Sequence, residues 1–388
     1  MNRNGTGRSL ERRLVEKMYA RADVRIDGDR PFDIKVSDER FFRRILLDGQ
    51  LGMGESYVDG WWSCDRIDEM TARFVNAGMH RESLWNPRVA LYRLKVKLSG
   101  VGRSGKAFEI AHRHYDLGNE LFRAMLDERM IYSCGYWRSA KTLAEAQEAK
   151  LDLVCRKLDL RRGMRVLDIG CGWGGWARFA AERHGVSVVG VTVSVEQRKL
   201  AEQICAGFPI EIRLADYREV KGRFDRIVSV AMLEAVGHRH YGMLMRMVDR
   251  CLVDDGLFLL HSIFANQPMG AAEAPWVQKY IFPNGELPSL GQVLSASEDV
   301  FAVEALHHLD GDYERTLAAW HDNFCANWGA LKKGYDERFY RMWTYYLQLS
   351  RGVFLARLTH VWQIVFSKKG MRPSNVGRPP APELFDAR

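Results

Sequence analysis

The segment MRVLDIGCGWGGWARFAAERHG, residues 164–185, constrains the fold of this chain more than any other. Its near-continuous apolar start, MRVLDIG, is typical of a strand covered on both faces, and GWARFAAERHG reads as a helix ended by a glycine. Asp168, Gly170, Gly172 and Gly174 stand between them, with the glycines spaced G-x-G-x-G. Glycine at such a turn lets the backbone approach a ligand closely. The spacing matches neither a dinucleotide-binding G-x-G-x-x-G loop nor a Walker loop.

From about residue 145 onward, apolar runs alternate with helical patterns, which predicts an α/β domain with a mainly parallel sheet. Besides MRVLDIG, six runs read as strands: VSVVGVTV, IEIRLAD, FDRIVSVAM, GLFLLHSI, FAVEALHHL and VWQIVFS. Helices are predicted near 313–333 and 336–357. We place this domain at residues 109–388 and expect a basic helix and linker over 89–108.

Residues 1–88 predict a small, separate α+β module. SLERRLVEKMY reads as an amphipathic helix capped by Ser9, and DERFFRRILLDG has helical spacing. Between them, ADVRIDGDRPFDIKVSD alternates and carries turn residues, so it predicts a hairpin.

Composition narrows the class of protein. The net charge of +8 in 388 residues suggests an anionic partner, either nucleic acid or a membrane surface, although a moderately basic enzyme without such a partner fits equally well. The seven cysteines are widely spaced with no CxxC pair, which disfavours disulfide frameworks and metal clusters and indicates a reducing, cytoplasmic compartment. No apolar run approaches the roughly 20 residues that span a bilayer, so any membrane contact should be peripheral.

A strand ending in D-x-G-x-G-x-G resembles the first motif of the Rossmann-like S-adenosylmethionine-dependent methyltransferases, in which this loop holds the amino acid part and ribose of the cofactor. One feature departs from that pattern. The second strand, GVTVSVEQ, lacks the carboxylate that many relatives use for the ribose, and offers Thr192, Ser194 and Gln197 instead. After the third strand, Asp216 and Tyr217 are expected beside the adenine, although Asp216 could equally be a surface turn residue.

Further motifs occur in a family's order: HYDLGNELF, YSCGYW, DIGCGWGG, GVTVSVEQ, DRIVSVAMLEAVG, LLHSI, KYIFPNGELPS and DYERTLAAW. Together they resemble the bacterial cyclopropane-fatty-acyl-phospholipid synthases, from about residue 10 to 368. The resemblance includes the N-terminal RPFDIKVSDERFFRRILLDGQLGMGESYVDGWW, which the mycolic acid cyclopropane synthases lack. It implies a Rossmann-like fold with a mainly parallel seven-stranded sheet. It also implies a homodimer, peripheral on the inner membrane face, whose N-terminal module docks to membrane or partner, and no nucleic acid.

The resemblance also implies a reaction. A cis double bond of a phospholipid acyl chain attacks the methyl group of S-adenosylmethionine, and a base removes a proton from the resulting cation so that a cyclopropane ring closes. The base in this family is a bound bicarbonate. Its ligands carry over to five residues: Cys134, Glu234, His261, Ile263 and Tyr313. Tyr132 and Ser133 are then expected at the cofactor, and the rings of Tyr136, Trp137 and Tyr280 at the acyl chain.

The same resemblance assigns a role to Cys134, which the residues alone leave open. Cys134, in YSCGYW, could be a nucleophile, a ligand or a core residue; in this family it is a weak donor lining the bicarbonate pocket. Relatives usually carry Glu-His-Val-Gly where this chain has Glu-Ala-Val-Gly, with Ala235.

A C-methyltransferase that makes methyl- or methylene-branched chains on the same lipids remains an alternative. An RNA methyltransferase would need an RNA-binding module, which the N-terminal segment does not resemble. A non-catalytic lipid-binding protein conflicts with the intact cofactor loop.

Overall fold

The computed structural model describes residues 9–82, 118–269 and 273–370. The chain forms two compact units, and the described part of the first comprises 9–82, 273–283 and 325–358. The second comprises 118–269, 284–324 and 359–370. The first unit therefore takes in segments that the sequence had grouped with the α/β domain. The expected basic helix and linker, 89–108, lies outside the described residues.

The first unit is mainly helical. Its helices are α1 (Leu10–Ala20), α2 (Arg40–Val58), α3 (Ile67–Asn76), α4 (Met79–Glu82), α12 (Pro275–Tyr280), α15 (Glu337–Leu355) and the end of α14 (Asp312–Leu331). As predicted, Ser9 caps α1, because its side chain accepts a hydrogen bond from the Arg12 N–H at 3.1 Å. Helix α2 is broken at Gly49, whose φ of 53° leaves the helical region.

The predicted hairpin is wrong. The short strand β1 (Lys35–Val36) pairs with β2 (Trp62–Ser63), which lies beyond α2 in the sequence. The preceding turn is organised by the buried Asp33 carboxylate, which accepts hydrogen bonds from the Arg25 and Arg30 N–H groups at 2.8 and 3.1 Å. The two halves of the predicted hairpin meet only in an isolated parallel bridge between Ile26 and Ile34, in a loop that the Asp33 carboxylate holds.

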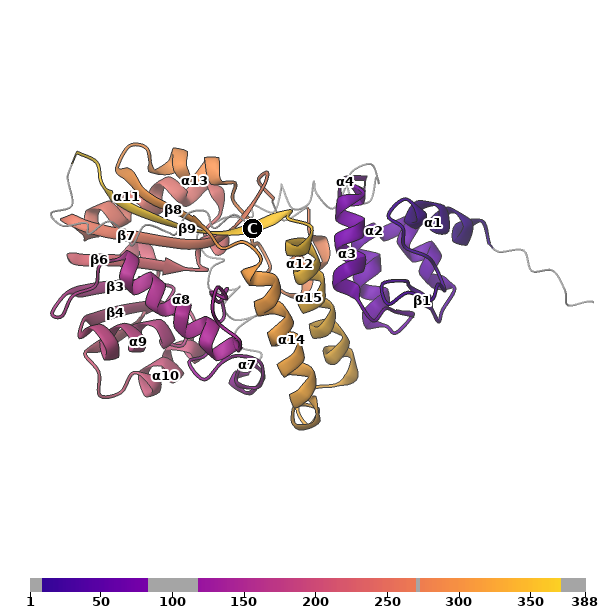
Figure 1. The fold of residues 1–388 in the computed structure, drawn as a ribbon, viewed down its shortest axis with the longest axis horizontal. Helices are drawn as coiled ribbons and strands as arrows, with labels where there is room; N and C mark the ends of the chain where they lie inside the picture. Colours follow the sequence, from indigo (N-terminus) through magenta and orange to yellow (C-terminus); the bar gives the residue numbers. More distant parts are fainter. Residues whose placement is uncertain (1–8, 83–117, 270–272, 371–388) are drawn as a thin grey trace, which may run out of the picture. The chain divides into compact units, whose positions relative to one another are not determined.

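The second unit holds a seven-stranded sheet, as predicted, in the order β5-β4-β3-β6-β7-β9-β8 (Figure 1). The strands are β3 (Arg165–Ile169), β4 (Ser187–Thr192), β5 (Ile210–Leu214), β6 (Phe224–Val230), β7 (Leu252–Ala265), β8 (Phe301–His308) and β9 (Thr359–Lys368). Only β9 runs antiparallel to its neighbours, β7 and β8. The helices are α7 (Asn119–Met125), α8 (Leu143–Lys157), α9 (Gly175–His184), α10 (Val195–Ile204), α11 (Tyr241–Cys251), α13 (Leu290–Ser297) and most of α14.

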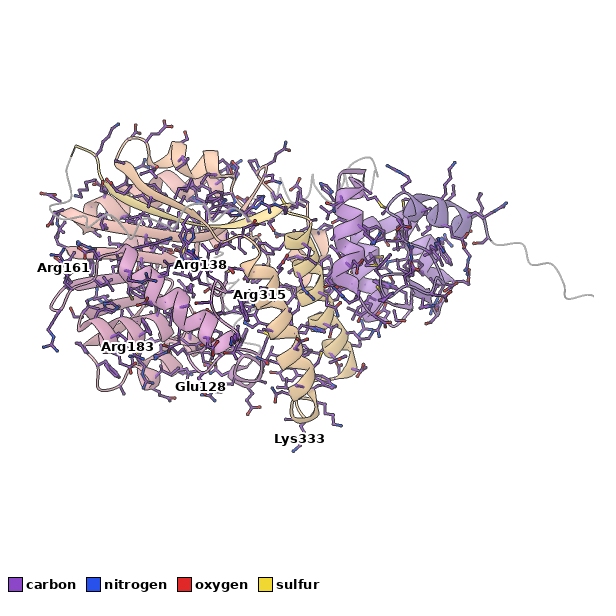
Figure 2. All side chains as sticks on the ribbon, viewed as in Figure 1. Glu128, Arg138, Arg161, Arg183, Arg315 and Lys333 are labelled. Carbon is purple, nitrogen blue, oxygen red and sulfur yellow. The ribbon has the colours of Figure 1, made fainter. Side chains whose placement is uncertain are left out.

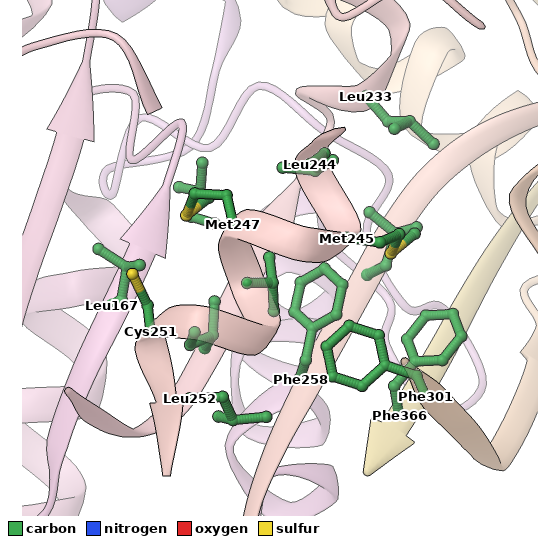
Figure 3. Close-up of a cluster of buried hydrophobic side chains, with 14 of the residues drawn as sticks. Leu167, Leu233, Leu244, Met245, Met247, Cys251, Leu252, Phe258, Phe301 and Phe366 are labelled. Atoms are coloured by element: carbon green, nitrogen blue, oxygen red, sulfur yellow. The ribbon is translucent and has the colours of Figure 1, made fainter. Parts of the chain in front are cut away.

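Successive residues of each strand point to opposite faces of this sheet, and each face is covered by its own helices. Leu167 and Phe258 lie in the cluster that includes α11 and α13 (Figure 3). Val166 and Leu259 lie in the cluster that includes α8 and α9. By this alternation Asp168 and His261 fall on the face that α8 covers. That face carries the polar groups described next.

The described residues contain neither a membrane-spanning helix nor a cluster of metal ligands. None of the helices resolved in 9–82, 118–269 and 273–370 is both long and apolar enough to cross a bilayer. Over the same ranges, His, Cys, Asp and Glu side chains form no cluster of three or more suited to a metal ion. All seven cysteines of the chain are free thiols.

Candidate active site

The loop between β3 and α9 has three glycines in left-handed conformations. The φ angles of Gly170, Gly172 and Gly174 are 84°, 54° and 81°. A Cβ at Gly170 would lie 2.9 Å from Met232, and one at Gly174 would lie 2.7 Å from the Cys205 sulfur, so close packing requires both glycines. A Cβ at Gly172 would meet nothing within 4 Å. The middle glycine therefore borders open space, where a ligand can approach the backbone.

Asp168, at the end of β3, is a buried carboxyl group. Burial raises its pKa to about 7, against the opposing attraction of Lys150. Lys150, on α8, is itself only 1% exposed, and its ammonium group donates a 2.9 Å hydrogen bond to the Ser133 hydroxyl. Burial lowers the Lys150 pKa to about 8, although Asp127, Cys134 and Asp168 favour its charged form. Lys150 is thus the electrostatic link between the cofactor loop and the YSCGYW segment.

Lys150 is not among the site residues predicted from the sequence, although the pattern of α8 contains a signal for it. Ala146, Lys150, Leu153 and Lys157 recur every three or four residues along the buried stripe of α8. Two lysines on an apolar helical stripe are unusual, because a buried ammonium group needs polar partners.

The YSCGYW segment is hydrogen-bonded to the helices on both sides of it. From α8, the Gln147 amide donates to the Ser133 carbonyl at 2.8 Å. From α14, the buried Thr316 hydroxyl accepts from the Gly135 N–H at 3.0 Å and from the Trp137 indole N–H at 2.9 Å. These bonds set the position of Cys134, which lies between the anchored residues.

Cys134 is 1% exposed, and its thiol donates to the Gly135 carbonyl at 3.2 Å. Burial, and then the nearby Asp312 carboxyl, raise the pKa of this thiol well above its ordinary value. A thiol that stays protonated is a poor nucleophile and a weak hydrogen-bond donor. The protonated, buried thiol therefore disfavours covalent catalysis, and because its single S–H already bonds the Gly135 carbonyl, its donation to an anion stays a prediction.

The aromatic candidates occupy different surroundings. Tyr132 and Tyr313 both pack on Trp320, with ring centroids 5.0 and 5.8 Å away. Arg315 lies on α14 (Figure 2). Its guanidinium carbon is 4.6 Å from the Trp137 ring centroid, so a cation already occupies one face of that indole. The Tyr136 ring contacts the His307 ring edge-on at 5.8 Å. The fourth candidate, Tyr280, belongs to the first unit, where its hydroxyl donates to Glu55 at 2.9 Å, and its role at the acyl chain stays a prediction.

Glu234 follows β6 and brings a carboxyl group to a buried position. One oxygen, Oε1, accepts a 2.7 Å hydrogen bond from the Ile263 N–H. The other oxygen, Oε2, is buried and has no hydrogen-bond partner among the described residues. Burial raises the pKa of this carboxyl group. Because Glu234 engages the Ile263 N–H, the contact expected between Ile263 and an anion stays a prediction, whereas the unpaired oxygen is free to meet a ligand.

His261 lies level with the end of β6, because it pairs in register with Val230. Its Nδ1 is 3.1 Å from the Gln363 amide nitrogen. Burial, with the charges of Lys150 and Lys157 and the neighbouring His307, lowers the His261 pKa well below its ordinary value. The imidazole is therefore neutral at physiological pH.

The candidate ribose residues Thr192, Ser194 and Gln197 are hydrogen-bonded to one another. The Thr192 hydroxyl donates to Gln197 Oε1 at 2.8 Å, and the Ser194 hydroxyl caps α10 by accepting from the Gln197 N–H at 3.2 Å. The Gln197 NH₂ group thus remains as a donor for a ligand. Burial opposes ionisation of Asp216, but hydrogen bonds from Arg218 outweigh it and hold the pKa of Asp216 low. Asp216 is thus a turn cap in an ion pair, Tyr217 packs on the apolar cluster, and their contacts with adenine stay predictions.

This arrangement of loop, buried carboxyl groups and neutral histidine can now be compared with known proteins. Residues 103–364 match the family model described as mycolic acid cyclopropane synthetase. The chain belongs to this family. It is 46% identical over 356 residues to the cyclopropane-fatty-acyl-phospholipid synthase of Escherichia coli K12, covering 92% of this chain and 93% of that one. It is 33% identical over 350 residues to the tuberculostearic acid methyltransferase UfaA1 of Mycobacterium tuberculosis, covering 84% and 81%.

Solved structures of this cyclopropane synthetase family share the fold. The cyclopropane synthase MmaA2 of M. tuberculosis is 30% identical with a TM-score of 0.64, covering 67% of this chain and 98% of that one. The mycolic acid cyclopropane synthase CmaA1, complexed with SAH and CTAB, has the same TM-score at 33% identity, covering 68% and 98%. Coclaurine N-methyltransferase, at 21% identity and a TM-score of 0.67, shares the fold alone. The predictions of a methyltransferase fold and of an enzyme of the cyclopropane synthase type are thereby confirmed.

Proposed function

We propose that this enzyme transfers the methyl group of S-adenosylmethionine to a cis double bond of a phospholipid acyl chain and closes a cyclopropane ring, with bound bicarbonate as general base. The observation that carries this proposal is the 46% identity to the E. coli synthase, which covers 92% of the chain. The similarity reaches beyond the α/β unit into the N-terminal module, as expected if both units act on a phospholipid.

The described residues fit the cofactor. S-adenosylmethionine, when bound, supplies an electrophilic methyl group on a sulfonium sulfur. The backbone at Gly172 borders open space for it, and the Gln197 NH₂ group offers a donor. The buried Asp168 carboxyl group, with its raised pKa, would ionise more readily beside a cationic ligand.

The residues also fit an anion that acts as the base. Bicarbonate, when bound, supplies a proton acceptor, and two of the side chains expected beside it are poor substitutes for it. Cys134 holds a protonated thiol, and the depressed pKa of His261 makes its imidazole a weak base. The buried Glu234 Oε2, which has no partner among the described residues, is a suitable contact for the bicarbonate hydroxyl or, when protonated, a donor to its oxygens. Tyr313 is proposed as a further ligand through its hydroxyl group.

Water must be kept from the cationic carbon that methyl transfer leaves on the acyl chain. Around Tyr132, the Phe122 and Trp320 rings lie with centroids 5.3 and 5.0 Å from its own. Such packing excludes water, and aromatic faces stabilise a cation.

Membrane contact is part of the proposal. We place the enzyme on the inner membrane face as a homodimer that prefers anionic lipids, which the net charge of +8 supports. In the N-terminal module, Leu10 and Leu14 lie one turn apart on α1 and are 64% and 47% exposed. Exposed leucines on a helix with Lys17 in its last turn suit the surface of a bilayer.

One alternative has a specific observation in its favour. The 33% identity to a tuberculostearic acid methyltransferase covers 84% of the chain, so the enzyme could instead leave a methyl or methylene branch. In ring closure the transferred methyl group loses a proton and its carbon bonds to the neighbouring cationic carbon. A methylene branch instead requires a hydride shift that moves the cation to the methyl-bearing carbon before the methyl group loses its proton, and a saturated methyl branch would further require a two-electron reductant.

Product analysis tests both functions. The purified enzyme is incubated with methyl-labelled S-adenosylmethionine and liposomes carrying cis-monounsaturated chains, with saturated chains as the control. Cyclopropanation predicts label in the lipid and proton NMR signals of a ring methylene, whereas the alternative predicts a branched chain without a ring. Carbonate depletion should slow turnover and added bicarbonate should restore it. Turnover indifferent to carbonate in a degassed assay would remove bicarbonate from the mechanism.

A further inference from the structure

Three polar side chains form a row across three neighbouring strands: Gln363 and His261 are buried, and His307 is partly buried. Gln363 on β9 pairs in register with His261 on β7 and with His307 on β8, so the three side chains share one face of the sheet. Lys157, the last residue of α8, reaches the same row. Its ammonium group lies 2.6 Å from Gln363 Oε1 and 2.7 Å from His307 Nδ1.

The hydrogen bonds of this row have only one consistent direction. An ammonium group donates and cannot accept, so the Gln363 oxygen must face Lys157. The NH₂ end of the same amide then faces His261 Nδ1, which must accept the hydrogen bond. A neutral imidazole that accepts through Nδ1 carries its proton on Nε2.

We propose that Gln363 and Lys157 are positioning residues that hold His261 as the Nε2–H tautomer, a fixed hydrogen-bond donor toward the anion of the active site. The presence of an anion beside Nε2, as well as its identity, rests on the proposed function, whereas the tautomer rests on the hydrogen bonds of the row. A proton on Nδ1 would face the donor end of the Gln363 amide, and turning the amide would place its NH₂ against Lys157. The row therefore prevents His261 from taking up a proton through Nδ1.

The charged and titratable groups around His261 agree with this assignment. Lys150 and Lys157 approach from α8, and His307 lies beyond Gln363 on β8; all three lower the His261 pKa in addition to burial. Even if Lys157 loses one proton, its two remaining N–H groups can still serve Gln363 and His307. Burial lowers the Lys157 pKa to about 7, so the row is directed most firmly below that pH, where Lys157 is an ammonium group that can only donate.

The test is ¹⁵N NMR of the ligand-free protein labelled at histidine, with the His261 signals assigned by their loss in His261→Asn. The wild type should show a protonated Nε2 and an unprotonated Nδ1. Gln363→Glu places an acceptor against Nδ1 and should move the proton there. Gln292→Glu is the matched control, because it adds the same charge at a capping box that accepts either residue, and it should change nothing.

Lys157→Met keeps the test valid if Gln363→Glu does not fold. It frees the amide to turn and should give a mixture of tautomers. A proton on Nδ1 in the wild type, or on Nε2 in Gln363→Glu, would overturn the proposal. Turnover should fall about 10- to 150-fold in Gln363→Glu and not in the control. A wild type that transfers no methyl group would refute the proposed function, while the tautomer result would stand.

Discussion

Replacing Thr316 by valine should release the YSCGYW segment from α14. The side chain is fully buried, and its hydroxyl accepts two hydrogen bonds, from the Gly135 N–H at 3.0 Å and the Trp137 indole N–H at 2.9 Å. Valine has nearly the same shape but leaves both buried donors without a partner. Each such donor costs about 1–3 kcal/mol, so Thr316→Val should cost about 2–6 kcal/mol. Thr316→Ser keeps the hydroxyl and loses one methyl group, worth about 1 kcal/mol.

Hydrogen exchange measured on peptides covering residues 131–137 gives a local assay, which suits a chain of two compact units better than a global melt. The Gly135 amide should exchange about 30-fold faster or more in Thr316→Val than in the wild type, and only about fivefold faster in Thr316→Ser. Methyl transfer should fall with the valine variant, because Ser133 and Cys134 move with the segment. Equal protection of Gly135 in the two variants would show that the hydroxyl does not anchor it.

Four further results are expected. Gly172→Val should abolish S-adenosylmethionine binding in calorimetry, while circular dichroism shows a retained fold. The valine side chain is strained at a φ of 54° and fills the open space beside the loop. Unchanged affinity would contradict the proposed cofactor site. Cys134→Ser should keep measurable turnover, whereas Glu234→Gln and His261→Ala should lose about 10- to 150-fold; a covalent adduct trapped on Cys134 would argue otherwise. Because burial raises the Cys134 pKa, little thiolate forms as the pH rises, and iodoacetamide labelling of this residue, followed by mass spectrometry, should stay slow up to about pH 9. Sedimentation with anionic vesicles should exceed that with neutral ones at low salt and weaken as salt is added, since each surface charge is worth about 1 kcal/mol; equal sedimentation would refute the electrostatic contribution.

The strands and the cofactor loop could be predicted because their signals are local. β3 and β4 are short apolar runs between glycines and polar residues, and each is covered on both faces in the structure. Even so, β7 runs from Leu252 to Ala265, beyond both ends of the predicted GLFLLHSI. Its ends depend on its pairing with β6 and β9, which the apolar pattern of a single strand does not encode.

The prediction of a hairpin was wrong for a related reason. Alternation reports which side chains are buried, but it does not name the partner strand. Here Lys35 pairs with Ser63, on the far side of a 19-residue helix, and residues 26 and 34 form only an isolated parallel bridge. Likewise, the helical periodicity of residues 336–357 predicted α15 correctly but could not show that it belongs to the unit of α2 and α3.

The sequence by itself determined the order of strands and helices, the glycine loop and, through ordered motifs, the family. Tertiary structure alone decided which ordinary residues complete the site. Thr316 accepts a hydrogen bond from Gly135, 181 residues away in the sequence, and Lys157 donates one to Gln363, 206 residues away. A backbone preference arises from neighbours along the chain, so it can be read from a short segment. The protonation of a thiol or an imidazole arises from burial and from hydrogen-bond partners, and these exist only once distant segments have packed together.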